Sequence, residues 1–218
     1  MAVPGTEPAP ARVLRTVAVL LVVAVVAFGL VALVHEATRD DIAAAARARQ
    51  LARFAEVLDG RAFDNDLLED VLAVRDAELL GTGAPLRAFR ARRDGRPVAV
   101  VLEAVAPQGY GGAIGLLVGI APDGTLLGVR VTSHRETPGL GDAIEPRKSD
   151  WIGRFRGRSL RDPAASGWRV RKDGGEFDQF TGATITPRAV VGAVANVLVY
   201  FERHRDALLA EPATIETP

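Results

Sequence analysis

Cysteine is absent from this chain of 218 residues. A chain without thiols forms no disulfide and supplies no thiolate ligand to zinc or to an iron–sulfur cluster. A charge excess of either sign is also absent, because 27 Lys and Arg residues balance 27 Asp and Glu residues. The composition therefore argues against nucleic acid as a partner, since a phosphate-binding surface needs a basic excess. Any redox chemistry here needs a cofactor that is held by other means.

Patterns of metal ligands are scarce as well. His134 and Glu136 stand two positions apart, but two side chains do not complete a coordination sphere. The other His, Asp and Glu residues show no recognisable ligand spacing. We predict no metal site, and from the residues alone we interpret this segment as a polar turn around Pro138-Gly139.

One long apolar run is present near the N-terminus. Residues Thr16–Val34 contain no charged side chain, and as a helix they span about 28 Å, close to the hydrocarbon thickness of a bilayer. A secretory signal has a shorter apolar core with a small-residue cleavage site directly after it. This run ends instead in Leu33-Val34-His35-Glu36. We therefore predict a retained transmembrane helix over residues 13–35, after a disordered tail of residues 1–12.

Charge does not set the orientation of this span. Arg12 and Arg15 precede it, whereas four arginines follow it between residues 39 and 53. The positive-inside rule therefore does not favour a cytoplasmic N-terminus.

After the span, Ile42, Ala46, Phe54 and Leu58 recur at roughly helical intervals, which predicts a membrane-proximal helix or linker over residues 36–60. Glycine, aspartate and asparagine then break the pattern between residues 60 and 66. We predict a folded domain over residues 61–210 and a loose tail over residues 211–218.

Four strand-like runs lie in the first half of the predicted domain, over residues 86–93, 97–105, 114–121 and 125–132. Asp94-Gly95 and Pro122-Asp123-Gly124 are typical of tight turns between antiparallel strands. The runs predict a meander with one face that needs cover, and the apolar helical pattern from Pro187 to about Leu209 can supply it. The predicted fold class is α+β, an antiparallel sheet covered by helices. Trp168–Arg171 is predicted as an additional edge strand.

The segment before that helix, Asp178-Gln-Phe-Thr-Gly-Ala-Thr-Ile-Thr-Pro187, combines hydroxyls with small residues. Gly182 and Ala183 let backbone amides approach a ligand closely, and free N–H groups at a helix N-terminus favour phosphate. Thr186 is predicted as the N-cap and Pro187 as the first helical residue. From the residues alone, two interpretations stay open: a phosphate seat beside an exposed Thr184 hydroxyl, or a plain loop and helix cap.

The pattern Asp178-x-x-Thr-Gly-Ala-Thr184 resembles the flavinylation signature of a family of FMN-binding domains. This family includes the G subunit of Rnf electron-transport complexes and the C subunit of sodium-pumping NADH:quinone oxidoreductases. Two further segments are similar to the family in the same order, Gly109-Tyr-Gly-Gly112 and His134-Arg-Glu-Thr-Pro-Gly-Leu-Gly141. The Gly-Tyr-Gly-Gly stretch favours the Rnf branch.

The resemblance implies that Thr184 carries FMN through a phosphoester bond. A separate flavin transferase would form this bond from FAD with a divalent metal. Asp178 and Thr181 match the other fixed positions of the signature, and Glu136, Thr137 and Leu140 are implied contacts of the isoalloxazine ring. The predicted cofactor-binding residues are completed by Gly182, Ala183 and Thr186. No residue is assigned a catalytic role, and Tyr110 is a candidate to stack on the flavin or on a neighbouring subunit.

The function implied is that of a membrane-anchored flavoprotein subunit. It would relay electrons within a complex that couples electron transfer to ion translocation, with a single span and a periplasmic domain at the bacterial inner membrane. Implied partners are the other subunits, the flavin transferase and membrane lipid. Two alternatives stay open: the C subunit of the sodium-pumping reductase, and a non-redox, membrane-anchored binding or assembly module whose threonine turn holds only a phosphate or a peptide.

Overall fold

The computed structural model describes residues 9–210. The predicted C-terminal tail lies outside this range, and so does the predicted N-terminal tail up to residue 8. Helix α1 (Ala9–Val57) begins at Ala9, so residues 9–12 of the predicted N-terminal tail are helical. The chain divides into two compact units, Met1–Leu51 and Ala52–Pro218.

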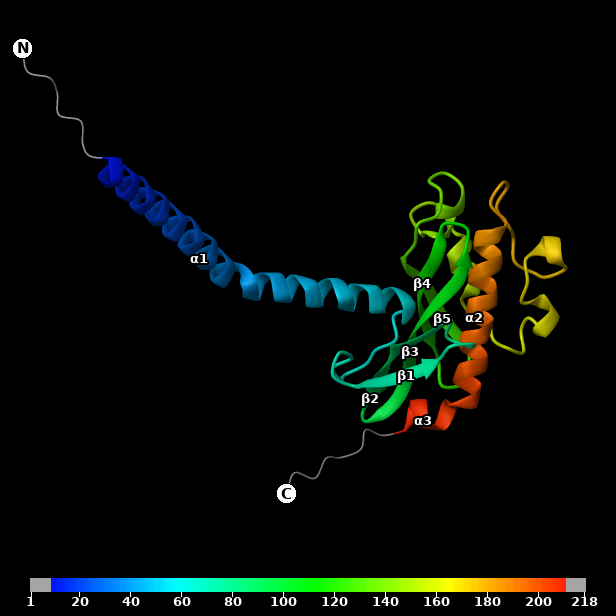
Figure 1. The fold of residues 1–218 in the computed structure, drawn as a ribbon. Helices are drawn as coiled ribbons and strands as arrows, with labels where there is room; N and C mark the ends of the chain where they lie inside the picture. Colours follow the sequence, from blue (N-terminus) through cyan, green and yellow to red (C-terminus); the bar gives the residue numbers. More distant parts are fainter. Residues whose placement is uncertain (1–8, 211–218) are drawn as a thin grey trace, which may run out of the picture. The chain divides into compact units, whose positions relative to one another are not determined.

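Helix α1 supplies all of the described structure of the first unit (Figure 1). Its large apolar side chains from Val13 to Val34 are 53–77% exposed. The helix is long and apolar enough to cross a membrane. Exposed side chains of this kind need an apolar surrounding, because water would solvate them poorly.

Five antiparallel strands form a single sheet in the second unit, in the order β1-β2-β3-β4-β5. The α+β prediction is confirmed, and the four predicted runs correspond to β2–β5. Strand β1 is not anticipated, because it is short and no tight-turn dipeptide separates it from β2. The strands are β1 (Val71–Asp76), β2 (Thr82–Arg93), β3 (Arg96–Gly109), β4 (Gly112–Ile120) and β5 (Leu126–Ser133).

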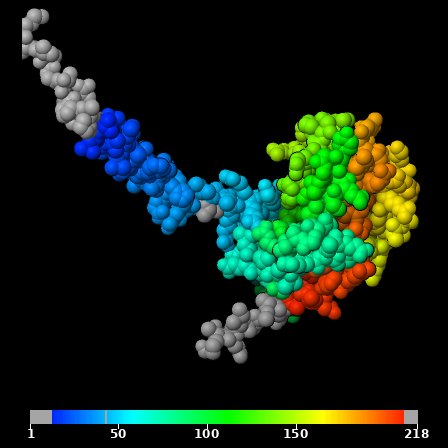
Figure 2. All heavy atoms as spheres, viewed as in Figure 1, coloured from blue at the N-terminus to red at the C-terminus, as the bar shows by residue number. Residues whose placement is uncertain are grey.

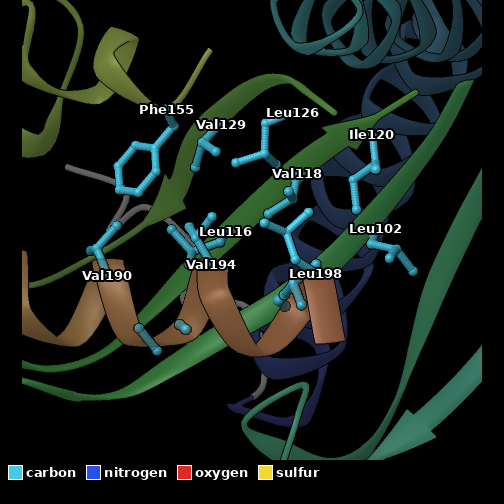
Figure 3. Close-up of a cluster of buried hydrophobic side chains, with 14 of the residues drawn as sticks. Leu102, Leu116, Val118, Ile120, Leu126, Val129, Phe155, Val190, Val194 and Leu198 are labelled. Carbon is cyan, nitrogen blue, oxygen red and sulfur yellow. The ribbon is translucent and has the colours of Figure 1, made fainter. Parts of the chain in front are cut away.

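Helix α2 (Ile185–Arg203) covers one face of this sheet. Alternate residues of β4, among them Leu116 and Val118, face α2, as expected from the two-residue repeat of a strand. Figure 3 shows Val190, Val194 and Leu198 of α2 directed toward these strand residues. The helix is therefore held to the sheet by a continuous apolar core, although its composition would also suit a membrane span.

The opposite face of the sheet receives the last turn of α1, which belongs to the second unit. Phe54, Val57 and Leu58 are buried there, and the Phe54 and Phe89 rings lie 4.6 Å apart between centroids. A Cβ atom on Gly119 would lie 2.0 Å from the Val57 carbonyl oxygen. Only glycine permits this approach, so β4 is adapted to the helix end that packs on it.

Trp168–Arg171 does not form the predicted edge strand. The segment follows one short 3₁₀ turn (Ala165–Gly167) and enters another at Arg171, and Val170 makes one isolated parallel bridge to Phe177. Trp168 and Val170 are buried while Arg169 and Arg171 are exposed, which mimics strand alternation. The burial comes from an aromatic cluster, in which Phe177 lies 5.2 Å from Trp168 between ring centroids. This loop-rich segment, yellow in Figure 2, lies at one edge of the domain.

The predicted C-terminal helix is divided in two. Helix α2 ends at Arg203, His204 leaves the helical region with φ −118° and ψ 16°, and α3 (Arg205–Leu209) follows. The His204 ring lies 2.9 Å from the Tyr200 carbonyl oxygen through Nδ1. The side chain thus competes with the main chain for that carbonyl, which ends the regular helix.

Candidate functional site

Three segments that lie far apart in the sequence line one pocket of about 270 Å³. They are the β3–β4 turn, the loop after β5 and the turn that leads into α2. These segments carry the three motifs that the sequence analysis singled out. The lining residues are Tyr110, Glu136, Thr137, Leu140, Gly141, Gly182, Ala183, Thr184, Ile185 and Thr186.

Exposed apolar side chains gather around this pocket. Among residues 52–210, the exposed large apolar side chains are Tyr110 (70%), Leu140 (43%) and Ile185 (45%). All three line the pocket. Apolar groups concentrated at one concave site are typical of a binding site for an apolar or aromatic ligand. Sequence reasoning missed Ile185, although an apolar residue between two threonines was the available signal.

Thr184 stands at the N-terminal end of α2 as its N-cap residue, with helical backbone angles. Its side chain is half-buried and makes no capping hydrogen bond. The first intrahelical bond runs from the Arg188 N–H to the Thr184 carbonyl oxygen at 3.3 Å. The N–H groups before Arg188 have no partner within the helix, so they can receive an anion beside the Thr184 hydroxyl.

The predicted start of this helix was wrong by two residues. Helix α2 begins at Ile185, so Thr186 and Pro187 both lie in its first turn. Thr186 is fully buried, and its hydroxyl donates a hydrogen bond to Glu136, so it does not cap the helix. Pro187 is tolerated because its missing N–H would have no intrahelical partner anywhere in the first turn.

The turn before Thr184 is tight. Gly182 has φ +81°, a conformation that disfavours other residues. The Ala183 N–H donates to the Phe180 carbonyl oxygen at 3.1 Å, which closes the turn. Gly182 and Ala183 border the pocket, whereas Thr181 is exposed and does not line it.

Glu136 is a buried carboxylate, only 5% exposed. Its Oε1 accepts a hydrogen bond from the Gly111 N–H at 2.9 Å, and its Oε2 accepts one from the Thr186 hydroxyl. Glu136 therefore joins the β3–β4 turn to the first turn of α2. Each of its oxygens already has a donor from the protein, whereas Thr137 and Leu140 are exposed at the pocket mouth.

Asp178 lies outside the pocket lining. Its carboxylate pairs with Arg171 at 3.1 Å and with Arg154 at 3.6 Å, and its carbonyl oxygen accepts a hydrogen bond from the Trp151 indole at 2.7 Å. Arg154 and Arg171 also line a neighbouring basic groove with Arg156 and Arg158. Asp178 thus lies on a charged surface, although in the sequence it directly precedes the threonine turn.

His134 contacts both Glu136 and Glu145. The Glu136 N–H donates to His134 Nδ1 at 3.1 Å, and His134 Nε2 lies 3.0 Å from Glu145 Oε1. Within the described residues, no group of three or more His, Asp or Glu side chains is placed to hold a metal ion.

Comparison with protein-family models gives two matches. Residues 109–199 match the FMN-binding domain, and residues 9–57 match the RnfG N-terminal region. The first match begins at the β3–β4 turn and includes all three segments of the pocket.

Several relatives are similar over most of the chain, and each is the G subunit of an ion-translocating oxidoreductase complex. The protein from Pseudomonas aeruginosa is 51% identical over 90% of this chain and 92% of the relative. The protein from Vibrio atlanticus is 48% identical over 89% and 92%, and that from Cereibacter sphaeroides is 52% identical over 83% and 80%.

A solved structure, the C subunit of the Na(+)-translocating NADH-quinone reductase from Parabacteroides distasonis, aligns with a TM-score of 0.41 and 19% identity. The alignment covers 72% of this chain and 76% of that chain. The three relatives above, in contrast, are 48–52% identical to this chain over at least 80% of their own length. This chain therefore belongs to the family of ion-translocating oxidoreductase complex G subunits, and it contains the FMN-binding domain of that family.

Proposed function

We propose that this chain is the FMN-carrying subunit of an ion-translocating oxidoreductase complex and relays electrons through FMN esterified to Thr184. One observation carries the proposal. Thr184, at the N-terminus of α2, makes no capping hydrogen bond through its side chain, and it lines the same pocket as the exposed apolar side chains of the domain. Such a pocket offers one end to a phosphate and the other to an aromatic ring.

The residues present fit FMN. Backbone N–H groups at the start of α2 suit its phosphate, and Gly182 and Ala183 leave room for it. Tyr110, Leu140 and Ile185 offer apolar surface to the isoalloxazine ring, and the exposed Thr137 offers a hydroxyl. Bound FMN supplies the electron-transfer chemistry, while the protein supplies binding and orientation.

Attachment of the flavin is a phosphoryl transfer. The Thr184 Oγ1 would attack the FMN-side phosphorus of FAD held by a flavin transferase with a divalent metal. An Oγ1–P bond would form while the pyrophosphate P–O bond breaks, with AMP as the leaving group. The hydroxyl proton would pass to a base of the transferase and then to solvent. No electron would be transferred, so the flavin would keep its oxidation state.

Helix α1 provides the anchor in this proposal. Its exposed apolar segment would cross the bacterial inner membrane once, amid lipid, with the folded domain on the periplasmic side. One span cannot form an ion pathway, so ion translocation falls to other subunits of the complex. The chain is thus a subunit of an oxidoreductase and not a complete enzyme.

The test is co-expression of the full-length chain with its flavin transferase, followed by in-gel fluorescence of the denatured protein. Wild-type protein should fluoresce after denaturation and show an added mass of FMN size, because the flavin is covalently bound. Thr184→Val should abolish both signals, since the variant lacks the acceptor oxygen. Thr132→Val, at an exposed threonine of β5 outside this pocket, is the matched control and should remain fluorescent.

A colourless wild-type protein under these conditions would refute the electron-carrier function. It would favour the alternative of a membrane-anchored binding module whose threonine turn holds only a phosphate or a peptide.

A further inference from the structure

We propose that Glu136 is a positioning residue for flavin attachment. It ties the first turn of α2 to the β3–β4 turn and thereby aims the Thr184 hydroxyl at the incoming phosphorus. The inference rests on the proposed function. It assigns Glu136 a role toward the protein itself and not toward the isoalloxazine ring.

The contacts of the carboxylate carry the argument. Glu136 Oε2 accepts from the hydroxyl of Thr186, which is fully buried and lies two residues after Thr184. Glu136 Oε1 accepts from the Gly111 N–H at 2.9 Å. The same side chain therefore holds α2 at one oxygen and the β3–β4 turn at the other.

The space around Glu136 is shaped by glycines from two of the motifs. A Cβ atom on Gly109 would lie 2.8 Å from Glu136 Oε1, and one on Gly141 would lie 2.7 Å from Oε2 and 2.9 Å from the Thr186 Oγ1. A Cβ atom on Gly111 would lie 1.9 Å from the Arg135 carbonyl oxygen. Any side chain at these positions would displace the carboxylate or the loop that carries it. This accounts for Gly109 and Gly111 of the Gly-Tyr-Gly-Gly stretch and for Gly141 of the second motif.

Two features hold Glu136 in place. Its side chain bridges the first turn of α2 and the β3–β4 turn through the two hydrogen bonds described above. The Glu136 backbone is held separately, because its N–H donates to His134 Nδ1 at 3.1 Å. The anchor is therefore rigid at both its side chain and its main chain.

Rigidity at Thr186 determines where Thr184 points. Helical residues have fixed angular offsets, so a fixed Thr186 side chain sets the rotation of the whole first turn. Phosphoryl transfer depends on alignment of the attacking oxygen, and a displacement of about 1 Å can cost about 100-fold in rate. Loss of the Glu136–Thr186 bond should therefore slow attachment without weakening recognition by the transferase.

Steady-state flavinylation of the full-length protein, at varied concentration and with catalytic amounts of purified transferase plus FAD and magnesium, tests this role. Thr186→Val keeps the shape but lacks the donor, and it should lower kcat by about 10–100-fold with KM for the protein substrate unchanged. Thr186→Ser restores the donor and should recover most of the rate. Glu136→Gln keeps the size of the side chain and one amide oxygen, and it should also lower kcat.

The two side chains act as one unit, so the double variant Glu136→Gln/Thr186→Val should be no slower than the slower single variant. Fluorescence of the two buried tryptophans, Trp151 and Trp168, reports whether each unmodified variant is folded. If Thr186→Val does not fold, Glu136→Gln alone decides.

Wild-type kcat in both Thr186→Val and Glu136→Gln would overturn the positioning role, as would a change confined to KM. A Thr186→Ser variant as slow as Thr186→Val would overturn it too. In these cases a mass adduct on Thr184 would leave the proposed function intact. Absence of any adduct on the wild-type protein would refute the proposed function itself.

Discussion

Thr184 and Thr186 stand two residues apart and have different environments. Thr186 is fully buried and bonded to Glu136, whereas Thr184 is half-buried with no capping hydrogen bond. Successive helical residues are rotated by about 100°, so neighbours of this spacing lie on nearly opposite sides of the helix. One hydroxyl can therefore serve the protein interior while the other stays available for chemistry.

Asp178 belongs to the same signature as Thr184 but does not line the pocket. We predict that Asp178→Ala lowers flavin incorporation, because its pairs with Arg154 and Arg171 order the surface that precedes the threonine turn. Such half-exposed ion pairs contribute only about 0–1 kcal/mol to stability, so the domain should stay folded. The measurement is in-gel flavin fluorescence per amount of protein, together with the urea midpoint.

Asp162→Ala is the matched control for this prediction. Asp162 is an exposed acid of the same loop-rich segment and pairs with Arg158 at 3.5 Å. Equal flavin occupancy in the wild-type protein and in Asp178→Ala would mean that Asp178 is only a surface turn residue.

At the scale of elements, α2 joins the core to the site. Its buried face packs on the sheet, and its N-cap residue, Thr184, lines the pocket. The hydrogen bond of Thr186 to Glu136 adds a second attachment at that end. The position of the Thr184 hydroxyl therefore depends on packing along the whole helix as well as on local contacts.

We predict that Leu198→Ala destabilises the domain by about 2–5 kcal/mol, the range for removal of a buried leucine side chain with partial collapse of the cavity. Leu198 is only 1% exposed and faces the sheet (Figure 3). Urea unfolding of the full-length protein in detergent, followed by tryptophan fluorescence, measures the free energy of unfolding.

Asn196→Ala changes an exposed residue of the same helix, and it should shift this free energy by less than about 0.5 kcal/mol. Similar losses in the two variants would contradict the packing of α2 described above.

At the scale of the whole molecule, the absence of cysteine becomes an experimental advantage, because an introduced cysteine is then the only thiol of the chain. We predict that Arg96→Cys, at an exposed position beside the β2–β3 turn, reacts with a membrane-impermeant thiol reagent in intact spheroplasts. The reason is the proposed periplasmic location of the domain. The measurement is the fraction labelled before and after lysis.

Leu102→Cys provides the control, because this position is fully buried and should label in neither condition while the protein is folded. Labelling of Arg96→Cys only after lysis would place the domain in the cytoplasm and reverse the proposed orientation.

Features set by neighbouring residues were predictable from the sequence. The turn dipeptide Asp94-Gly95 and the apolar, strand-like runs on either side of the turns indicated β2–β5, because turn chemistry and the composition of short runs are local. The long apolar run indicated the helical segment of α1. The three motifs indicated the family and the candidate acceptor, Thr184, because each motif is a short run of adjacent residues.

Only the tertiary structure decided how these pieces meet. It showed that Thr186 donates a hydrogen bond to Glu136, fifty residues away. It also showed that burial alternates along Trp168–Arg171 because of an aromatic cluster and not because of a sheet. It also brought Tyr110, Leu140 and Ile185 to one pocket. Contacts of this kind depend on how segments far apart in the sequence pack together, and no local sequence pattern specifies that packing. The sequence by itself thus determined the motifs and most of the elements, and the packing of α2 on the sheet determined the site.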